Sequence, residues 1–144
     1  MKIAVLDIGG TSIKAGIYEN GSLRDCREFA TDAYLGGESV MRKAIGILKG
    51  CCGFERIGIS TAGQVDSSAG VIRFANSNIP GYTGTRIRDI MEKEFRVPVA
   101  VENDVNAAAL GEAAFGAGQS FRDFLMLTYG TGVGGAVVMD GGIY

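Results

Sequence analysis

Two adjacent glycines, Gly9 and Gly10, interrupt the first apolar part of the chain and constrain its fold more than any other feature. Residues 2–6 are mostly apolar, which predicts a buried strand, and alternating apolar residues at 13–18 predict a second strand directly after the glycines. A turn of this kind, between two strands, can aim backbone amides into a concavity that suits phosphate. We therefore expect Gly9 and Gly10 to have positive φ angles or to lie in contact with a bound phosphate.

Asp7 lies at the mouth of this predicted hairpin. A carboxylate is useful there when it faces a cation, and a metal ion bound to nucleotide phosphates is the natural partner. Thr11 would then supply a hydroxyl and Lys14 a positive charge. The same residues also fit a tight hairpin with a solvated Asp7, because glycine-marked turns are common. On these residues alone both interpretations stay open.

Length and composition exclude several classes of protein. The chain has 144 residues, of which 47% are hydrophobic, enough for the core of one ordinary domain. A formal net charge of −2 disfavours a nucleic-acid partner or an anionic membrane. No apolar run approaches a membrane span or a signal peptide, so we expect a cytoplasmic protein with no membrane partner. Histidine is absent, which removes Ser-His and Cys-His nucleophiles, and Cys26, Cys51 and Cys52 are expected to be reduced.

Hydrophobic periodicity predicts an α/β order of elements after the hairpin. The predicted elements are strands at 23–31, 57–60 and 97–101, helices at 38–49, 84–95 and 105–115, and a final pair of strands at 124–128 and 136–139. Thr83 or Thr85 is expected to cap the second helix. Residues 61–83, rich in Gly, Ser and Asn, are predicted to form a long irregular loop, and loops of this length are usually functional.

Asn103 and Asp104 stand between a predicted strand and a predicted helix. Polar side chains at the C-terminal end of a strand, beside a helix N-terminus, occupy the place where α/β proteins bind ligands. The alternative is that Asp104 only caps the helix.

A second glycine-rich turn, at residues 130–135, lies between the last two predicted strands. Its spacing matches G-x-G-x-x-G, but a dinucleotide site needs a helix after the glycines and an apolar strand follows here. A Rossmann site is therefore excluded. What remains is a second strand-glycine-strand hairpin, and two such hairpins suggest duplicated phosphate-binding elements.

Five segments resemble, in order, motifs of the ROK family of sugar kinases and sugar-responsive repressors, within the actin, heat-shock ATPase and sugar-kinase superfamily. They are DIGGTSIK at 7–14 and LTYGTGVGG at 127–135, which resemble the two phosphate motifs, ISTAGQVD at 59–66 and NSNIPGY at 76–82, which resemble the sugar-pocket segments, and VENDVNAAALGE at 101–112, which resembles the catalytic-Asp segment. One departure is Ala136, where the family often has a third glycine. Its methyl group is expected to crowd the phosphate turn slightly without excluding a nucleotide.

The resemblance implies an α/β fold of the ribonuclease-H-like (actin-like ATPase) type. This fold has a mixed sheet, with a three-stranded antiparallel meander plus parallel strands, and flanking helices. The implied domains are 1–119 and the start of a second ATPase domain at 120–144. Because family members are longer, we expect an N-terminal portion that is inactive alone. The parent is expected to be a homodimer, and the zinc site of many members is not expected in this chain.

The resemblance also implies an ATP-dependent kinase for a hexose or an N-acetylhexosamine, with ATP and Mg²⁺ as cofactors. Asp104 would be the base that takes the proton from a sugar hydroxyl as the γ-phosphoryl group transfers. The implied binding residues are Gly9, Gly10, Thr11, Lys14, Gly130, Thr131 and Gly132 for nucleotide phosphates, Gly63, Asn78, Asn103 and Asp104 for the sugar, and Asp7 for Mg²⁺ through water.

Two other functions fit part of the sequence. A sugar-sensing repressor of the same family would keep the sugar pocket without turnover, but such repressors carry a helix-turn-helix ahead of this domain. Here Met1 directly precedes the first strand, which together with the acidic balance favours the kinase. An ATPase that does not act on sugars would explain both glycine hairpins but would leave the segments at 102–104 and 78–81 without a role.

Overall fold

Residues 1–130 and 132–144 are described by the structure, which is a computed structural model. They divide into two units, Met1–Glu102 and Asn103–Tyr144. The strands that begin in the first unit are β1 (Lys2–Ile8), β2 (Ser12–Glu19), β3 (Ser22–Ala30), β4 (Arg56–Thr61), β5 (Gln64–Asp66), β6 (Val71–Phe74) and β7 (Val99–Asn103). Its helices are η1 (Ala33–Leu35), α1 (Gly37–Lys49) and α2 (Ile87–Phe95).

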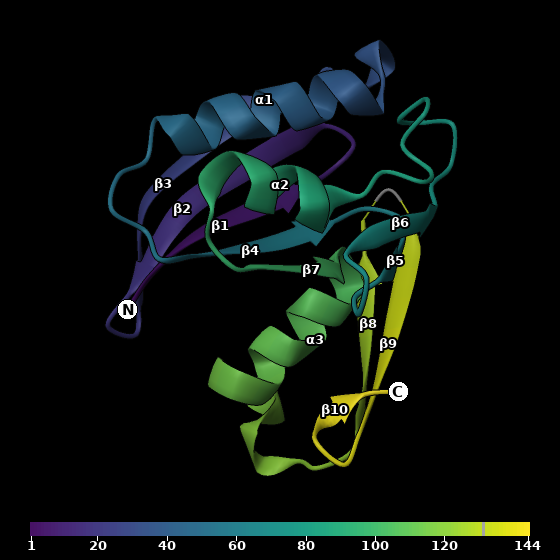
Figure 1. Ribbon diagram of the computed structural model, residues 1–144. Coiled ribbons are helices and arrows are strands. Elements are labelled where there is room, and N and C mark those ends of the chain that lie inside the picture. Colours follow the sequence, from purple (N-terminus) through teal and green to yellow (C-terminus); the bar gives the residue numbers. More distant parts are fainter. Residues whose placement is uncertain (131) are drawn as a thin grey trace. The chain divides into compact units, whose positions relative to one another are not determined.

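Five strands of the first unit form one mixed sheet in the order β3-β2-β1-β4-β7 (Figure 1). The first three are a meander, since β1 pairs antiparallel with β2 and β2 with β3. β4 returns parallel to β1 on its other side, after the crossover through α1. This mixed sheet with flanking helices confirms the predicted fold class.

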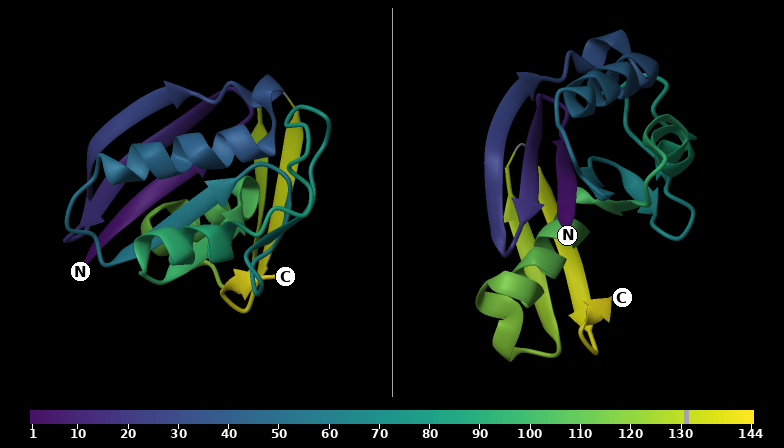
Figure 2. Two further views of the ribbon diagram at one scale, coloured as in Figure 1. Left: turned by 45° about the horizontal axis from the view of Figure 1, so that its top comes forward. Right: turned by 60° about the vertical axis from the view of Figure 1, so that its left-hand side comes forward.

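The core lies on one face of this sheet, under α1 and α2, which both cover that face (Figures 1 and 2). Alternation along β1 places Ala4, Leu6 and Ile8 in the core, because successive side chains of a strand point to opposite faces. The residues between them, Val5 and Asp7, therefore point to the opposite face. This alternation decides which side of the sheet presents Asp7.

The long loop predicted at 61–83 is wrong in part, because β5 and β6 form an antiparallel hairpin within it. The second helix begins at Ile87 rather than at residue 84. The residues before it pair with β6 instead: the Ile72 amide donates to the Thr85 carbonyl (3.0 Å), and Arg86 forms an isolated bridge with Val71. Neither Thr83 nor Thr85 is the cap, since the N-cap residue is Arg86 and no side chain caps this helix end.

The second unit is an antiparallel sheet with a helix packed against it. Its elements are α3 (Asp104–Phe115), η2 (Ala117–Ser120), β8 (Phe124–Tyr129), β9 (Val133–Met139) and β10 (Gly142–Ile143), and the sheet order is β10-β9-β8. β9 begins three residues earlier than predicted. Glycine at position 134 allows this part of β9 to pack against α3, because a Cβ there would lie only 2.6 Å from Cγ2 of Val105. Ala136 is buried with Ala109 and Val138, so its methyl group belongs to this small core and not to the turn.

Three further observations bear on the predictions. The division between the units after Glu102 rests on contacts within this chain, and the domain boundary after residue 119 stays a prediction. Cys26, Cys51 and Cys52 are free thiols. Among the described residues, every helix is too short or too polar to cross a membrane.

Candidate functional site

The turn between β1 and β2 is closed by backbone bonds. The Gly9 amide donates to the Ser12 carbonyl at 3.0 Å, and a Cβ at Gly9 would lie 3.1 Å from the same oxygen, so glycine permits the tight closure. Gly10 and Thr11 are exposed at the tip. The prediction of positive φ at Gly9 and Gly10 is wrong. The alternative in that prediction, contact with a phosphate, stays open.

Thr31, directly after β3, fixes this turn from outside. Its hydroxyl donates to the Gly9 carbonyl at 2.7 Å, and its amide donates to the Thr11 carbonyl at 2.9 Å. The side chain is 1% exposed, so the bond is shielded from water. Sequence reasoning missed Thr31, because it lies about twenty residues from the turn along a strand that reads as polar.

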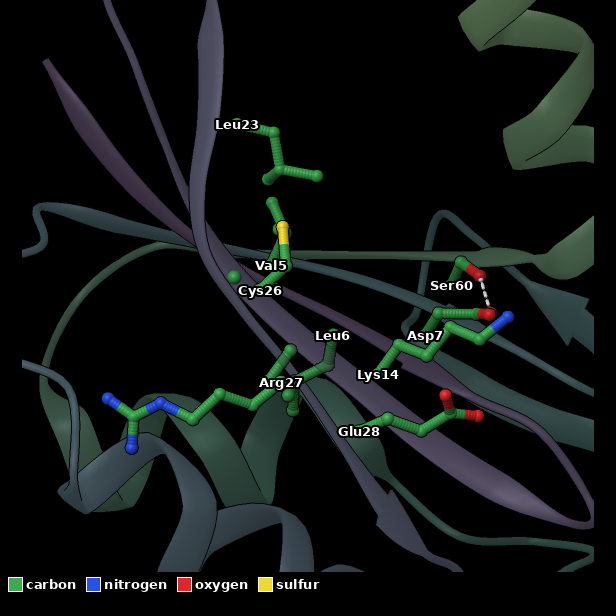
Figure 3. A pocket seen from close by; sticks show the side chains of 11 residues that line it. Val5, Leu6, Asp7, Lys14, Leu23, Cys26, Arg27, Glu28 and Ser60 are labelled. Atoms are coloured by element: carbon green, nitrogen blue, oxygen red, sulfur yellow. Dashed lines mark hydrogen bonds between the residues drawn. The ribbon is translucent and has the colours of Figure 1, made fainter.

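Asp7 lies in a row of polar side chains on the face of the sheet opposite α1 and α2 (Figure 3). It pairs in register with Lys14 on β2 and with Ser60 on β4, and Lys14 pairs in turn with Glu28 on β3. The Ser60 hydroxyl donates to Oδ1 of Asp7 at 2.5 Å. These four side chains line a cavity of about 540 Å³ whose remaining wall is largely apolar.

The same row contains Lys14, which is expected to contact phosphate, and Asp7, which is expected to face a metal ion. Lys14 lies between two carboxylates in the row, those of Asp7 and Glu28, and its contact with phosphate stays a prediction. Among the described residues no cluster of three or more His, Cys, Asp or Glu side chains is suited to a metal. A single carboxylate fits Mg²⁺ that arrives with a nucleotide, because Mg²⁺ usually keeps several waters and binds one or two carboxylates plus substrate phosphates.

The second glycine turn joins β8 to β9. Gly130 and Gly132 are exposed, and the Gly130 amide donates to the Gly132 carbonyl at 2.9 Å. Thr131 lies outside the described residues. Their contact with phosphate stays a prediction.

Asn103 and Asp104 form a hydrogen-bonded pair at the start of α3. The Asn103 carboxamide oxygen accepts from the amides of Val105 (2.9 Å) and Asn106 (3.1 Å), so Asn103 is the helix cap. Its amide nitrogen donates to Oδ1 of Asp104 at 2.8 Å, and the Val105 amide donates to the same oxygen at 2.9 Å. Asp104 is exposed, and its carboxylate is oriented by these two donors. The N-cap residue is therefore Asn103, and Asp104 contributes one further bond to the helix start through the Val105 amide.

Gly63 and Asn78 lie on two connecting segments of the first unit. Gly63 follows β4 with a φ of 101°, and a Cβ there would lie 2.9 Å from the Phe74 carbonyl, so the backbone itself requires glycine. Asn78 is exposed, and its amide donates to Oδ1 of Asn76 at 3.1 Å. A sugar contact at either residue stays a prediction.

The segment that carries Asn78 is anchored by Tyr82, which is 0% exposed. The Tyr82 and Thr61 hydroxyls lie 2.9 Å apart and are hydrogen bonded. Burial raises the pKa of Tyr82 to about 12, so the phenol is neutral.

Within the first unit, Gly63 lies beside the end of β1. The Ala62 amide, directly before Gly63, donates to the Ile8 carbonyl at 3.0 Å.

Comparison with known proteins finds a matching family model and several similar proteins. A family model described as ROK family matches residues 3–144. An uncharacterised protein of Clostridium perfringens (strain 13 / Type A) is 47% identical over 142 residues, which is 96% of this chain and 48% of that protein. A glucokinase of Thermotoga maritima is 36% identical over 145 residues, or 98% of this chain and 45% of that protein. A beta-glucoside kinase of Listeria innocua is 33% identical over 147 residues, or 99% and 48%.

Solved structures of similar sequence share the fold. A ROK hexokinase from Thermus thermophilus is 40% identical, with a TM-score of 0.82 over 100% of this chain and 49% of that one. A ROK family glucokinase from Streptomyces griseus, in complex with glucose and AMPPNP, is 32% identical, with a TM-score of 0.88 over 100% and 46%. A ROK family transcriptional regulator has a TM-score of 0.89 over 99% and 38%, and at 18% identity it shows the fold alone. The chain spans about half the length of the curated relatives it matches.

Proposed function

This chain belongs to the ROK family, and we propose that the protein carrying it is an ATP-dependent sugar kinase for a hexose or an N-acetylhexosamine. The observation that carries the proposal is the exposed Asp104 carboxylate, oriented by Asn103 and the Val105 amide at the start of α3. Identities of 33–36% with a beta-glucoside kinase and a glucokinase over nearly the whole chain support it.

Asp104 is proposed as the general base. Phosphoryl transfer requires alignment and charge stabilisation more than covalent help, and a carboxylate at the acceptor oxygen makes that oxygen a better nucleophile. The two donors occupy Oδ1, which leaves Oδ2 to take the proton of the sugar hydroxyl. Asn103, Asn78 and Gly63 are proposed to contact the sugar.

The glycine turns are proposed to bind the nucleotide phosphates. Thr31 bonds the carbonyls of Gly9 and Thr11, on either side of Gly10, which reduces the reordering that phosphate binding would require. Gly130, Thr131 and Gly132 are assigned the same role, and Lys14 is assigned a charge contribution. Mg²⁺ would supply charge neutralisation at the phosphates when bound, and Asp7, fixed by Ser60, would orient one of its waters.

The test is a coupled assay of ADP release by the full-length protein that contains this sequence, with ATP, Mg²⁺ and a panel of hexoses and N-acetylated hexosamines. We expect one or a few sugars to stimulate ADP release well above the rate without sugar. Sugar binding by calorimetry without any ADP release would instead support the repressor. ADP release that no sugar stimulates would support an ATPase that does not act on sugars.

A further inference from the structure

The β5–β6 hairpin is attached to the rest of the first unit by backbone bonds between β6 and residues 84–86, and at its turn by side chains. Its strands pair with each other in a separate two-stranded sheet and not with the strands of the five-stranded sheet. Its turn is stabilised from within, because Oδ1 of Asp66 accepts from the Ser68 hydroxyl (2.6 Å) and the Ala69 amide (3.0 Å). These internal bonds shape the turn but do not set its position.

Arg88, on α2, connects this turn to β7. Its guanidinium donates to three backbone carbonyls: Nη2 to Ser67 at 2.6 Å, Nη1 to Ser68 at 2.6 Å and Nε to Val99 at 3.0 Å. The planar guanidinium presents several donors in a fixed geometry, which a lysine ammonium cannot reproduce. One side chain thus joins α2, the hairpin turn and the start of β7.

Gly70 allows Arg88 to come this close. The Arg88 amide donates to the Gly70 carbonyl at 3.2 Å, and a Cβ at Gly70 would lie 2.4 Å from Cβ of Arg88. Gly70 is buried and has a φ of 68°, so both the space and the backbone angle require glycine.

A second bond reaches the other end of β7. The Ser67 hydroxyl donates to Oε2 of Glu102 at 2.6 Å. Glu102 directly precedes Asn103 and Asp104 in the sequence. The turn is therefore bonded to both ends of β7, to Val99 through Arg88 and to Glu102 through Ser67.

We propose that Arg88 and Ser67 are positioning residues for the sugar site and do not touch the sugar themselves. β5 is only three residues long, so a displacement of the turn at 67–70 reaches Gly63 at the far end of the strand. The two residues would thus set, within the first unit, where the Gly63 segment lies relative to Val99 and Glu102 on β7. This inference rests on the proposed sugar kinase function.

The first test is steady-state kinetics of Arg88→Met and Arg88→Lys in the full-length protein, with the sugar found in the panel assay. Met keeps the apolar stem and removes all three guanidinium bonds, whereas Lys keeps the charge. We expect Arg88→Met to raise the sugar KM by about tenfold, with the ATP KM changed less than about twofold. Arg88→Lys should recover only part of the loss. Arg42→Met, which removes an exposed guanidinium paired with Glu38 on α1, is the matched control and should leave both KM values unchanged.

The second test does not depend on activity. Amide hydrogen exchange of the sugar-free protein should be faster for residues 64–74 in Arg88→Met than in the wild type, with β1 and β4 unchanged. If Arg88→Met does not fold, Ser67→Ala removes only the bond to Glu102 and takes its place in both tests. Equal increases in both KM values, a loss confined to kcat, or unchanged exchange at 64–74 would overturn the positioning role. Failure of the wild type to use any sugar would overturn the proposed function instead, and exchange would still show whether Arg88 holds the hairpin.

Discussion

At the scale of single residues, the first glycine turn depends on a side chain that is distant in sequence. Thr31 donates its hydroxyl to the Gly9 carbonyl and its amide to the Thr11 carbonyl. A buried hydroxyl that bonds a carbonyl is expensive to lose, because the carbonyl is then left without a partner in a shielded place. The turn is therefore held on both sides of Gly10 by one residue outside it.

Replacing Thr31 by Val keeps the side-chain shape and removes the hydroxyl. We expect Thr31→Val to lower the free energy of unfolding by about 1–3 kcal/mol. Thr31→Ser, which keeps the hydroxyl, is the control and should lose less. Urea denaturation monitored by circular dichroism measures both variants. A Thr31→Val protein as stable as the wild type would show that the bond to Gly9 contributes nothing.

At the scale of elements, the sequence predicts segments whose pattern is local. Period-two alternation and the turn at Asn20 and Gly21 predict the β1–β2–β3 meander, and apolar residues at helical spacing predict α1. The β5–β6 hairpin could not be predicted in this way. Its composition is that of a loop, and its turn is bonded by Arg88, which follows Ser67 and Ser68 by about twenty residues. The start of α2 is not predictable from local pattern for a related reason, since pairing with β6 keeps residues up to Arg86 out of the helix.

The same distinction between local and distant signals holds for the residues of the candidate site. Glycine turns and a strand-end Asn-Asp pair are local motifs, and the sequence indicates them. Thr31, Ser60 and Arg88, which bond to segments distant in sequence, are recognisable only when those segments are placed side by side by the fold.

The turn of the β5–β6 hairpin should respond to acid. The Ser68 hydroxyl, followed by the Ala69 amide and Arg73, lowers the pKa of Asp66 from 3.8 to about 2. Because the pKa is lower in the folded state, the ionised carboxylate stabilises the fold fully above 3.8, and this contribution is lost as the pH falls through about 2. Asp66→Asn should therefore be less stable than the wild type near neutral pH, with a difference that shrinks in acid. Denaturant unfolding across this pH range measures it, and a difference that does not change with pH would refute the assignment.

At the scale of the whole molecule, the two units differ in how much apolar surface they bury. The main core of the first unit joins both helices to the five-stranded sheet. The buried cluster of the second unit consists of Ala109, Ala136 and Val138, with four half-buried residues packed around it. Large side chains on β8 and β9, Leu125, Leu127 and Tyr129 among them, stay exposed.

This difference predicts unequal local stability within the 144-residue chain. Amides of β8 and β9 should exchange with solvent faster than amides of β1 and β4, because opening the second unit exposes less buried apolar surface. Hydrogen exchange followed by mass spectrometry measures both sets in one sample. Equal protection of the two pairs of strands would contradict the prediction.

One substitution tests most directly whether Asp104 is the base of a sugar kinase. The substitution Asp104→Asn keeps the size of the side chain and removes its ability to take a proton. In the full-length protein we expect kcat to fall by roughly 10²–10⁴-fold, while the sugar dissociation constant measured by calorimetry stays within a few-fold of the wild type. Asp25→Asn, at an exposed carboxylate on β3, is the control and should leave kcat unchanged. Undiminished turnover in Asp104→Asn would show that Asp104 is not the base.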